Sequence, residues 1–206
     1  MRPLIKICGI TNSEDANKCV ELGADFLGFI FAESPRTISA ETAEQIISEI
    51  PESIRTVALF KNNSIGFIES IIEKIPFSMV QLHGDENMYY ITRLNRPVIK
   101  SFDMTDKQLL SKISAYNGMG IIPLLDLPKE SQSSIPIDVA KEISLLQPIM
   151  LAGKINVFNI KKIINTIQPW CIDICSGVEK EPGKKDHALL EELFNLLSNN
   201  MHRCRP

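Results

Sequence analysis

Two side chains in this sequence are suited to moving protons, because each ends an apolar segment that has the composition of a strand. Cys8 closes segment 4–8 and is followed by Gly9, and Asp126 closes segment 120–126. A thiolate can take a proton and a protonated carboxyl group can give one, so such a pair suits general acid–base catalysis. The chemistry requires a fold that brings the two segment ends to one site.

The chain repeats a strand–helix unit eight times, with roughly 25 residues in each unit. The apolar segments predict strands at residues 4–8, 25–31, 56–60, 78–83, 97–102, 120–126, 148–152 and 170–175. The segments between them predict helices at residues 13–22, 40–50, 64–75, 85–94, 105–116, 138–146, 156–167 and 186–197. Asn12 or Ser13 is the expected cap of the first helix and Ser39 that of the second.

Eight such units predict an α/β fold, a single-domain (β/α)8 TIM barrel with parallel strands. We expect the barrel domain to span residues 1–198 and residues 199–206 to form a C-terminal tail. An open, doubly wound sheet has the same alternation of strands and helices, and it is the alternative fold.

Composition excludes several classes of function. The 206 residues carry a formal net charge of −3, which does not favour nucleic acid as a partner. No apolar segment approaches the ~20 residues of a membrane span, and the N-terminus lacks a signal peptide. These features predict a cytoplasmic protein that does not enter a membrane. The 5 cysteines include no CxxC pair and no metal-ligand spacing to histidine, so we expect reduced thiols and no metal.

Polar or small residues follow most of the predicted strands, whereas the strand interiors are aliphatic. Because the ligand site of a (β/α)8 barrel forms at the C-terminal ends of its strands, this bias places the site there. The strand ends include Cys8, His83, Ser101, Asp126, Gly153 and Cys175. The pattern locates a site without naming its reaction.

The ends of the seventh and eighth strands predict a phosphate site. Glycine-containing turns beside a helix N-terminus offer backbone N–H groups to an anion, and barrels often place a phosphate at this position. The helix expected from residue 156 would supply that N-terminus. The candidate residues are Gly153, Lys154, Ser176 and Gly177, with Lys184 and Lys185 as possible additional charges.

Lys6 and Asp173 are expected to pair inside the barrel. Lys6 shares a strand face with Cys8, and Asp173 shares one with Cys171 and Cys175. The first and last strands are neighbours when a barrel closes, so the ammonium and the carboxylate would meet in its interior.

Several of these segments resemble the phosphoribosylanthranilate isomerase family of tryptophan biosynthesis. The two most specific matches are KICGIT at residues 6–11 and SGVE with PGKKD at residues 176–186. The other matches, in the order of the family, are residues 23–25, 28–29, 34–36, 81–84, 124–126, 151–153 and 173.

The resemblance implies the barrel fold, a phosphosugar substrate and no cofactor or metal. It implies an Amadori rearrangement of N-(5-phosphoribosyl)anthranilate to 1-(2-carboxyphenylamino)-1-deoxyribulose 5-phosphate, with Cys8 as base and Asp126 as acid. It makes Arg36 the clamp on the anthranilate carboxylate and Asp173 a partner of a sugar hydroxyl. His83 is expected to contact the substrate, and the family includes monomers and homodimers.

The proposed acid and base place demands on their surroundings. Asp126 has to hold a proton at neutral pH, and the neighbouring Leu124, Leu125 and Leu127 would provide an apolar site. Cys8 has to lose its proton readily, which needs a local hydrogen-bond donor or positive charge. A structural interpretation remains open at each position: an inert buried Cys8, a solvated Arg36 and a purely structural ion pair of Asp173.

Two segments depart from the family pattern and leave other functions open. Residues 127–139 lack the Gly-Gly-rich loop of the family, and in segment 153–159 Lys154 replaces a second glycine. A glycine there would permit positive φ and close approach of the backbone to phosphate. The alternatives are another phosphosugar barrel, such as an epimerase or an aminoaldose isomerase of histidine biosynthesis, and a degenerate barrel that binds a ligand without turnover.

Overall fold

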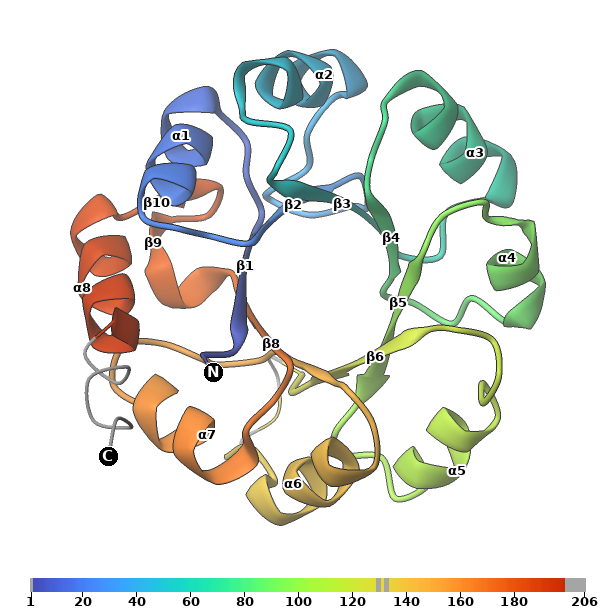
Figure 1. The fold of residues 1–206 in the computed structure, drawn as a ribbon. Coiled ribbons are helices and arrows are strands. Elements are labelled where there is room, and N and C mark those ends of the chain that lie inside the picture. Colours follow the sequence, from blue (N-terminus) through green and yellow to red (C-terminus); the bar gives the residue numbers. More distant parts are fainter. Residues whose placement is uncertain (1, 129–130, 132–133, 199–206) are drawn as a thin grey trace.

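The strands of the computed structural model form one closed parallel barrel (Figure 1). The structure describes residues 2–128, 131 and 134–198, so the predicted tail 199–206 lies outside the described residues. The barrel strands are β1 (Leu4–Cys8), β2 (Phe26–Ile30), β3 (Arg55–Phe60), β4 (Met79–Leu82), β5 (Val98–Asp103), β6 (Ile122–Asp126), β7 (Met150–Leu151) and β8 (Cys171–Ile174). Each pairs with the next in chain order, and β8 pairs with β1, which confirms the closed barrel and excludes the open sheet.

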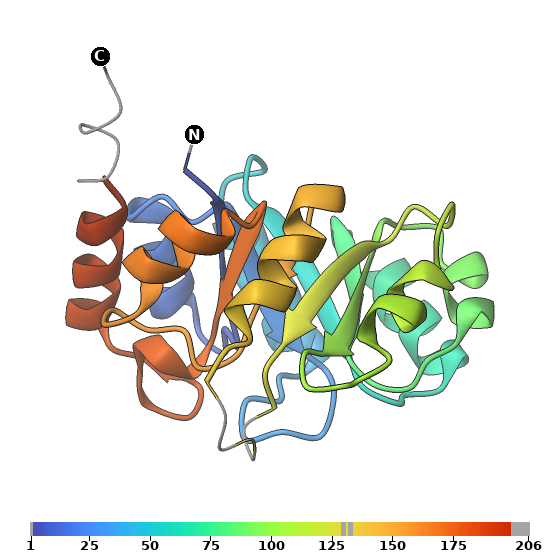
Figure 2. The ribbon, with the colours of Figure 1, turned by 90° about the horizontal axis from the view of Figure 1, so that it is seen from below.

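Helices surround the barrel, as Figure 2 shows from the side. They are α1 (Ser13–Glu21), α2 (Ala40–Glu49), α3 (Ile65–Lys74), α4 (Met88–Arg93), α5 (Leu109–Ser114), α6 (Ile137–Leu146), α7 (Ile160–Ile167) and α8 (His187–Ser198). The side chain of Asn12 accepts a hydrogen bond from the Asp15 N–H at 2.8 Å, and Ser39 accepts one from the Thr42 N–H at 3.1 Å. These contacts satisfy N–H groups that the first helical turn leaves unpaired.

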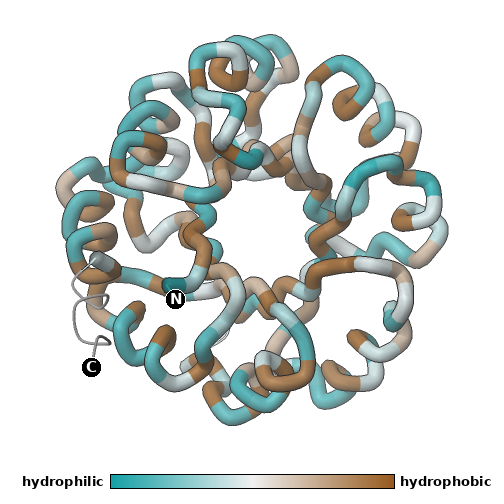
Figure 3. The backbone as a smooth tube through the Cα atoms, viewed as in Figure 1, coloured by the Kyte–Doolittle hydropathy of each residue, from teal (hydrophilic) through white to brown (hydrophobic). Residues whose placement is uncertain are grey.

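Two apolar layers hold the fold together. The larger lies between the barrel and the helices and includes Ile7, Leu27 and Phe29, all fully buried. The smaller fills the barrel interior and includes Phe26 and Met150. Figure 3 shows the same arrangement, with hydrophobic segments on the inner sides of the helices and hydrophilic segments outside. Each fully buried aliphatic or aromatic side chain contributes about 1.5–3 kcal/mol, so these layers fix the strand ends on which the site is built.

Three helices begin later than the sequence predicts, at Met88, Leu109 and Ile160 rather than at residues 85, 105 and 156. Short polar side chains before each helix bind backbone N–H groups and form turns that compete with helix. Asp106 accepts from the Gln108 N–H at 2.7 Å, and Asn156 accepts from the Phe158 N–H at 2.9 Å.

The segment between β8 and α8, predicted as a loop, contains regular structure. It consists of the short 3₁₀ helix η1 (Ser176–Val178) and the antiparallel hairpin of β9 (Glu179–Glu181) and β10 (Lys184–Lys185). Gly183 forms the turn with a φ of 84°. Within the part of the chain that the structure describes, no helix is both long and apolar enough to cross a membrane.

Candidate active site

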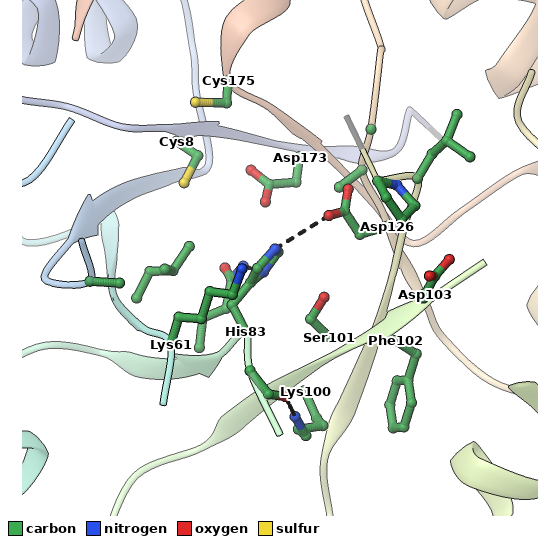
Figure 4. A pocket seen from close by; sticks show the side chains of 18 of the residues that line it. Cys8, Lys61, His83, Lys100, Ser101, Phe102, Asp103, Asp126, Asp173 and Cys175 are labelled. Atoms are coloured by element: carbon green, nitrogen blue, oxygen red, sulfur yellow. Dashed lines mark hydrogen bonds and ion pairs between the residues drawn. The ribbon is translucent and has the colours of Figure 1, made fainter. Parts of the chain in front are cut away.

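A cavity of about 1120 Å³ opens at the C-terminal ends of the barrel strands. Figure 4 shows part of its lining, with Cys8 and Asp126 on opposite sides, Asp173 between them, and His83 pointing toward Asp126. The residues that the sequence predicts for the site line this cavity, with the exception of the additional charges Lys184 and Lys185: Cys8, Arg36, His83, Asp126, Gly153, Lys154, Asp173, Ser176 and Gly177. The structure therefore brings the predicted set together in one place.

Cys8 lies at the buried side of the cavity, where 4% of its surface is exposed. Gly28 on the adjacent strand makes room for it. A Cβ atom at position 28 would lie 2.9 Å from the Cys8 sulfur and 3.0 Å from the Lys6 Nζ, so one or both of these side chains would have to shift. The absence of a side chain on β2 thus allows the thiol and the ammonium to occupy the same corner.

The surroundings of Cys8 favour its thiolate. A hydrogen bond from the Cys175 thiol lowers the pKa of Cys8 well below that of an ordinary thiol, although burial opposes this change. The positive charges of Lys6 and Lys185 lower it further. These neighbours provide the local donor and positive charge that the sequence analysis requires of a reactive Cys8.

Lys6 and Asp173 form the ion pair that the strand faces predict. The Lys6 Nζ lies 2.9 Å from each Asp173 carboxylate oxygen, and the two residues are partners in the β1–β8 register. Burial would lower the pKa of Lys6, but the charges of Asp173 and Cys8 raise it above its ordinary value. Burial raises the pKa of Asp173 to about 6, although Lys6 acts in the opposite direction.

Arg36 is held inside the protein by a carboxylate. Its Nε donates to both Glu179 carboxylate oxygens at 2.9 and 3.0 Å, and its Nη2 donates to one of them at 2.5 Å. Only 7% of the Arg36 side chain and 3% of the Glu179 side chain are exposed, so Arg36 is not a solvated surface charge. Nη1 is the guanidinium nitrogen that these bonds leave for another acceptor.

Lys185 and Glu179 are site residues whose place the sequence reasoning missed. The Lys185 Nζ donates to the Cys8 carbonyl at 2.6 Å and to Glu179 at 2.9 Å, and its side chain is fully buried. The expectation that Lys184 and Lys185 add charge to the phosphate site is wrong. Lys184 instead pairs with Glu181 on the outside of the hairpin, and neither lysine lines the cavity.

Asp126 has a different environment from the one expected. Its side chain is 25% exposed and one of its oxygens lies 3.3 Å from His83 Nε2, so it is not enclosed by its leucine neighbours. The reason is that the β6 side chains alternate, and Leu125 packs outward into the layer under the helices. Gln81 Nε2 lies 3.1 Å from His83 Nδ1, so the ring is held between Gln81 and Asp126.

A buried carboxylate fixes the loop that carries His83. Glu86 accepts from the Asn62 N–H at 2.7 Å and from the Gly84 N–H at 2.9 Å, and it pairs with Lys100 at 3.3 Å. The first two contacts join the loops that follow β3 and β4. Sequence patterns gave no signal for this contact, because its members come from three different strand–helix units.

The predicted phosphate end combines the turns that follow β7 and β8. Gly153 has a φ of 90°, and a Cβ there would lie 2.5 Å from the Leu127 backbone nitrogen. Lys154 has a φ of 54°, so this lysine adopts the left-handed conformation that the second glycine of the family pattern would favour. The predicted helix N-terminus at residue 156 is absent, and Gly177 instead lies in η1.

The described residues contain no group of three or more His, Cys, Asp and Glu side chains placed to hold a metal ion. The fold and the site together define a (β/α)8 barrel whose cavity presents a thiol, a carboxyl group and an arginine to a small molecule. The comparisons with known proteins identify the family within this class.

The family model described as N-(5'-phosphoribosyl)anthranilate (PRA) isomerase matches residues 5–196. The chain is 41% identical over 191 residues to N-(5'-phosphoribosyl)anthranilate isomerase of Bacillus cereus, a match that covers 88% of this chain and 92% of that one. Its counterpart in Bacillus anthracis is 39% identical over 189 residues, with 88% and 91% covered. The chain therefore belongs to the PRA isomerase family.

Solved structures agree with this assignment. The crystal structure of phosphoribosyl anthranilate isomerase from Thermotoga maritima superimposes with a TM-score of 0.89 at 31% identity, covering 96% of this chain and 99% of that one. A second structure of such an isomerase, in complex with reduced 1-(O-carboxyphenylamino)-1-deoxyribulose 5-phosphate, gives a TM-score of 0.84 at 30% identity, with 96% and 99% covered. The resemblance found in the sequence motifs is thereby confirmed.

Proposed function

We propose that this chain catalyses the reaction of its family, the aldose–ketose isomerisation of N-(5-phosphoribosyl)anthranilate in tryptophan biosynthesis, with Cys8 as base and Asp126 as acid. The observation that carries the proposal is their placement on one cavity of a chain that matches the family over residues 5–196. Protonation of the furanose ring oxygen opens the ring to an iminium ion. Removal of the C2′ proton then gives an enolamine, which tautomerises to the ketone.

The charged groups around Cys8 support its assignment as the base. Cys8 needs a thiolate to take the C2′ proton, and the Cys175 thiol and two lysines favour that form. Because these groups are fixed by buried contacts, the thiolate is prepared before substrate arrives. A prepared charge needs little reorganisation during the reaction.

The position of Asp126 supports its assignment as the acid, because its carboxyl group is accessible from the cavity. Asp126 opens into the cavity, where its carboxyl group can meet the ring oxygen of a bound sugar. In this role Asp126 has to hold a proton that it can give to the ring oxygen.

The two ends of the substrate have matching partners. A guanidinium binds a carboxylate through parallel N–H groups, and Arg36 presents Nη1 while Glu179 holds its other side. The turns at Gly153 and Gly177 suit the phosphate, because their backbones can approach an anion closely. Asp173 would accept a hydrogen bond from a sugar hydroxyl, in addition to holding Lys6.

Turnover of the substrate tests the proposal. Purified protein should consume N-(5-phosphoribosyl)anthranilate, followed by the loss of its fluorescence. The variants Cys8→Ser and Asp126→Asn should each lose about 10²–10⁴-fold in kcat while keeping their fold by circular dichroism. Cys19→Ala in α1 and the exposed Asp138→Asn in α6 serve as controls.

The outcomes separate the function from the residue roles. A well-folded wild type without turnover would contradict the proposed function and direct attention to segments 127–139 and 153–159. Turnover that survives one substitution would keep the function and overturn the role of that residue. The proposal also retains a cytoplasmic location. It further retains a monomeric or homodimeric state, and light scattering of the purified protein would decide between the two.

A further inference from the structure

Cys8 and Cys175 lie next to each other at the ends of neighbouring strands. The β1–β8 register runs as far as Ile7 and Ile174, and the two cysteines follow directly on either strand. The Lys185 Nζ reaches both of their carbonyl oxygens, at 2.6 Å and 3.4 Å. Figure 4 shows both side chains at the same corner of the cavity, and Cys175 packs against the apolar cluster that contains Cys8.

The two thiols have opposite character. The Cys175 thiol donates to a Glu179 oxygen at 3.9 Å, a long contact, and Cys175 packs against the apolar cluster that contains Cys8. The interaction with Cys8 raises the pKa of Cys175, and burial adds to that effect, whereas the pKa of Cys8 is lowered. A thiolate beside a protonated thiol is the arrangement of an attacking and a resolving cysteine.

Among the described cysteines, only these two line the cavity. Cys19 is fully buried in α1, and burial raises its pKa to about 12. Cys171 is fully buried in the barrel interior, and burial raises its pKa as well. A small oxidant that enters the cavity would therefore meet one reactive thiolate with one thiol beside it.

We propose that Cys8 and Cys175 form a redox modification site, at which a hydroperoxide converts the pair to a disulfide and stops proton abstraction by Cys8. In the first step the Cys8 thiolate attacks the terminal oxygen of the hydroperoxide, the O–O bond breaks, and the leaving alkoxide or hydroxide takes a proton from water and departs as alcohol or water. In the second step the Cys175 sulfur attacks the sulfur of the Cys8 sulfenic acid, the S–O bond breaks, and the leaving hydroxide takes the proton that Cys175 gives up and departs as water. Two thiols lose two electrons in total, and the hydroperoxide gains them.

The change of charge at Cys8 favours the second step. The Cys8 thiolate is the largest cause that holds the proton on Cys175. A sulfenic acid is neutral, so its formation removes this cause, and the charge of Lys185 then favours the Cys175 thiolate. Cys175 also lies after the last residue of β8, with a ψ of −85°, so the ladder does not fix its backbone.

The disulfide would protect the base as well as inhibit it. A sulfenic acid that meets no second thiol is oxidised further to sulfinic acid, which dithiothreitol does not reverse. A disulfide is reduced by dithiothreitol and returns both thiols. Cys175 would thus convert a permanent loss of the base into a reversible one.

Peptide mapping after oxidation tests this inference without requiring isomerase activity. The full chain is treated with hydrogen peroxide, free thiols are alkylated, and proteolytic peptides are identified by mass spectrometry. The expected product is a peptide pair joined through Cys8 and Cys175, which dithiothreitol separates. Cys19→Ala is the matched control and should give the same pair.

The variant Cys175→Ser provides the second readout. Wild type should lose turnover in peroxide and regain nearly all of it in dithiothreitol. Cys175→Ser, compared with its own untreated activity, should stay inactive and carry a sulfinic acid at Cys8. Wild type that carries sulfinic acid at Cys8 without the joined peptides would overturn the inference. Equal recovery in wild type and Cys175→Ser would overturn it as well.

Discussion

Two groups of residues on either side of the cavity, here called the thiol wall and the acid wall, differ in burial and in charge. The thiol wall consists of Cys8 and Asp173, which line the cavity, and of Lys6, Glu179 and Lys185, which support them without lining it. Its side chains are almost entirely buried, the Lys6–Asp173 and Lys185–Glu179 pairs are each 2.9 Å apart, and Lys185 donates to the Cys8 carbonyl at 2.6 Å. The acid wall consists of Gln81, His83 and Asp126, and its reactive carboxyl group is 25% exposed. The comparison teaches that buried ion pairs fix the charges around Cys8, whereas Asp126 lies in a partly exposed part of the cavity.

Burial explains why the thiol wall needs so many charges. An isolated thiolate in an apolar interior would be costly, and each added cation would itself be costly without a carboxylate. Lys6 and Lys185 favour the thiolate, and Asp173 and Glu179 compensate the two ammonium groups. The acid wall differs, because the side chains of His83 and Asp126 are 27% and 25% exposed and only Gln81 is fully buried.

Removal of the Glu179 carboxylate should give the largest change in stability among the variants that test the difference between the two walls. Glu179→Gln leaves the buried Arg36 and Lys185 without their shared carboxylate. We expect the free energy of unfolding to fall by about 3–5 kcal/mol in urea titrations. Glu181→Gln on the same hairpin is the control, and it should leave the midpoint unchanged because its pair with Lys184 is exposed. Equal midpoints for the two variants would contradict the description of the thiol wall.

Asp173 should give the thiol wall a distinctive pH dependence of stability. Its pKa of about 6 lies above its ordinary value of 3.8, so the folded state binds the proton more tightly than the unfolded state. The Asp173 contribution to stability is therefore full below pH ~4 and falls as pH rises to ~6, by up to about 3 kcal/mol. The stability difference between wild type and Asp173→Asn should shift by that amount across this range. A difference that is independent of pH would show that Asp173 ionises normally.

The activity of an Asp173 variant separates the structural role of Asp173 from its role in contacting the substrate. Asp173→Ala that folds less stably but keeps full kcat and KM would mean that Asp173 serves only to hold Lys6. A loss of activity in a folded sample would support its contact with a sugar hydroxyl.

His83 should give the smallest effect and should act on the acid wall alone. His83→Gln removes the imidazole that lies 3.3 Å from Asp126. We expect kcat to fall roughly tenfold, equivalent to about 1.4 kcal/mol, with little change in stability. The control is His187→Gln, since His187 pairs with Asp15 and does not line the cavity. A changed alkylation rate of Cys8 in His83→Gln would contradict the separation of the two walls.

The fold and much of the cavity lining could be predicted from the sequence, for a physical reason. Short aliphatic strands at regular spacing define the barrel, and the barrel alone brings Cys8, Asp126 and His83 to one end. The pairing of Lys6 with Asp173 followed from the period of two along each strand and from closure of the barrel. The assignment to the family rested on motifs rather than on these patterns.

The remaining features depend on contacts that have no local pattern. Glu179 and Lys185 reach the thiol wall because a hairpin, where the sequence predicted a loop, folds back beneath Cys8. The exposure of Asp126 depends on how its neighbours pack. The backbone of Lys154 takes a conformation that its residue type disfavours, and only the structure reveals it.

The pH dependence of Cys8 alkylation tests the central claim most directly. Iodoacetamide reacts with thiolates, so its rate constant at Cys8, followed by peptide mapping, reports the ionised fraction. We predict a rate constant that stays level through neutral pH in the folded protein, because the neighbours of Cys8 lower its pKa well below that of an ordinary thiol. A rate constant that rises about tenfold per pH unit up to pH ~8.5, as for the unfolded chain, would show that the thiol wall does not prepare the base.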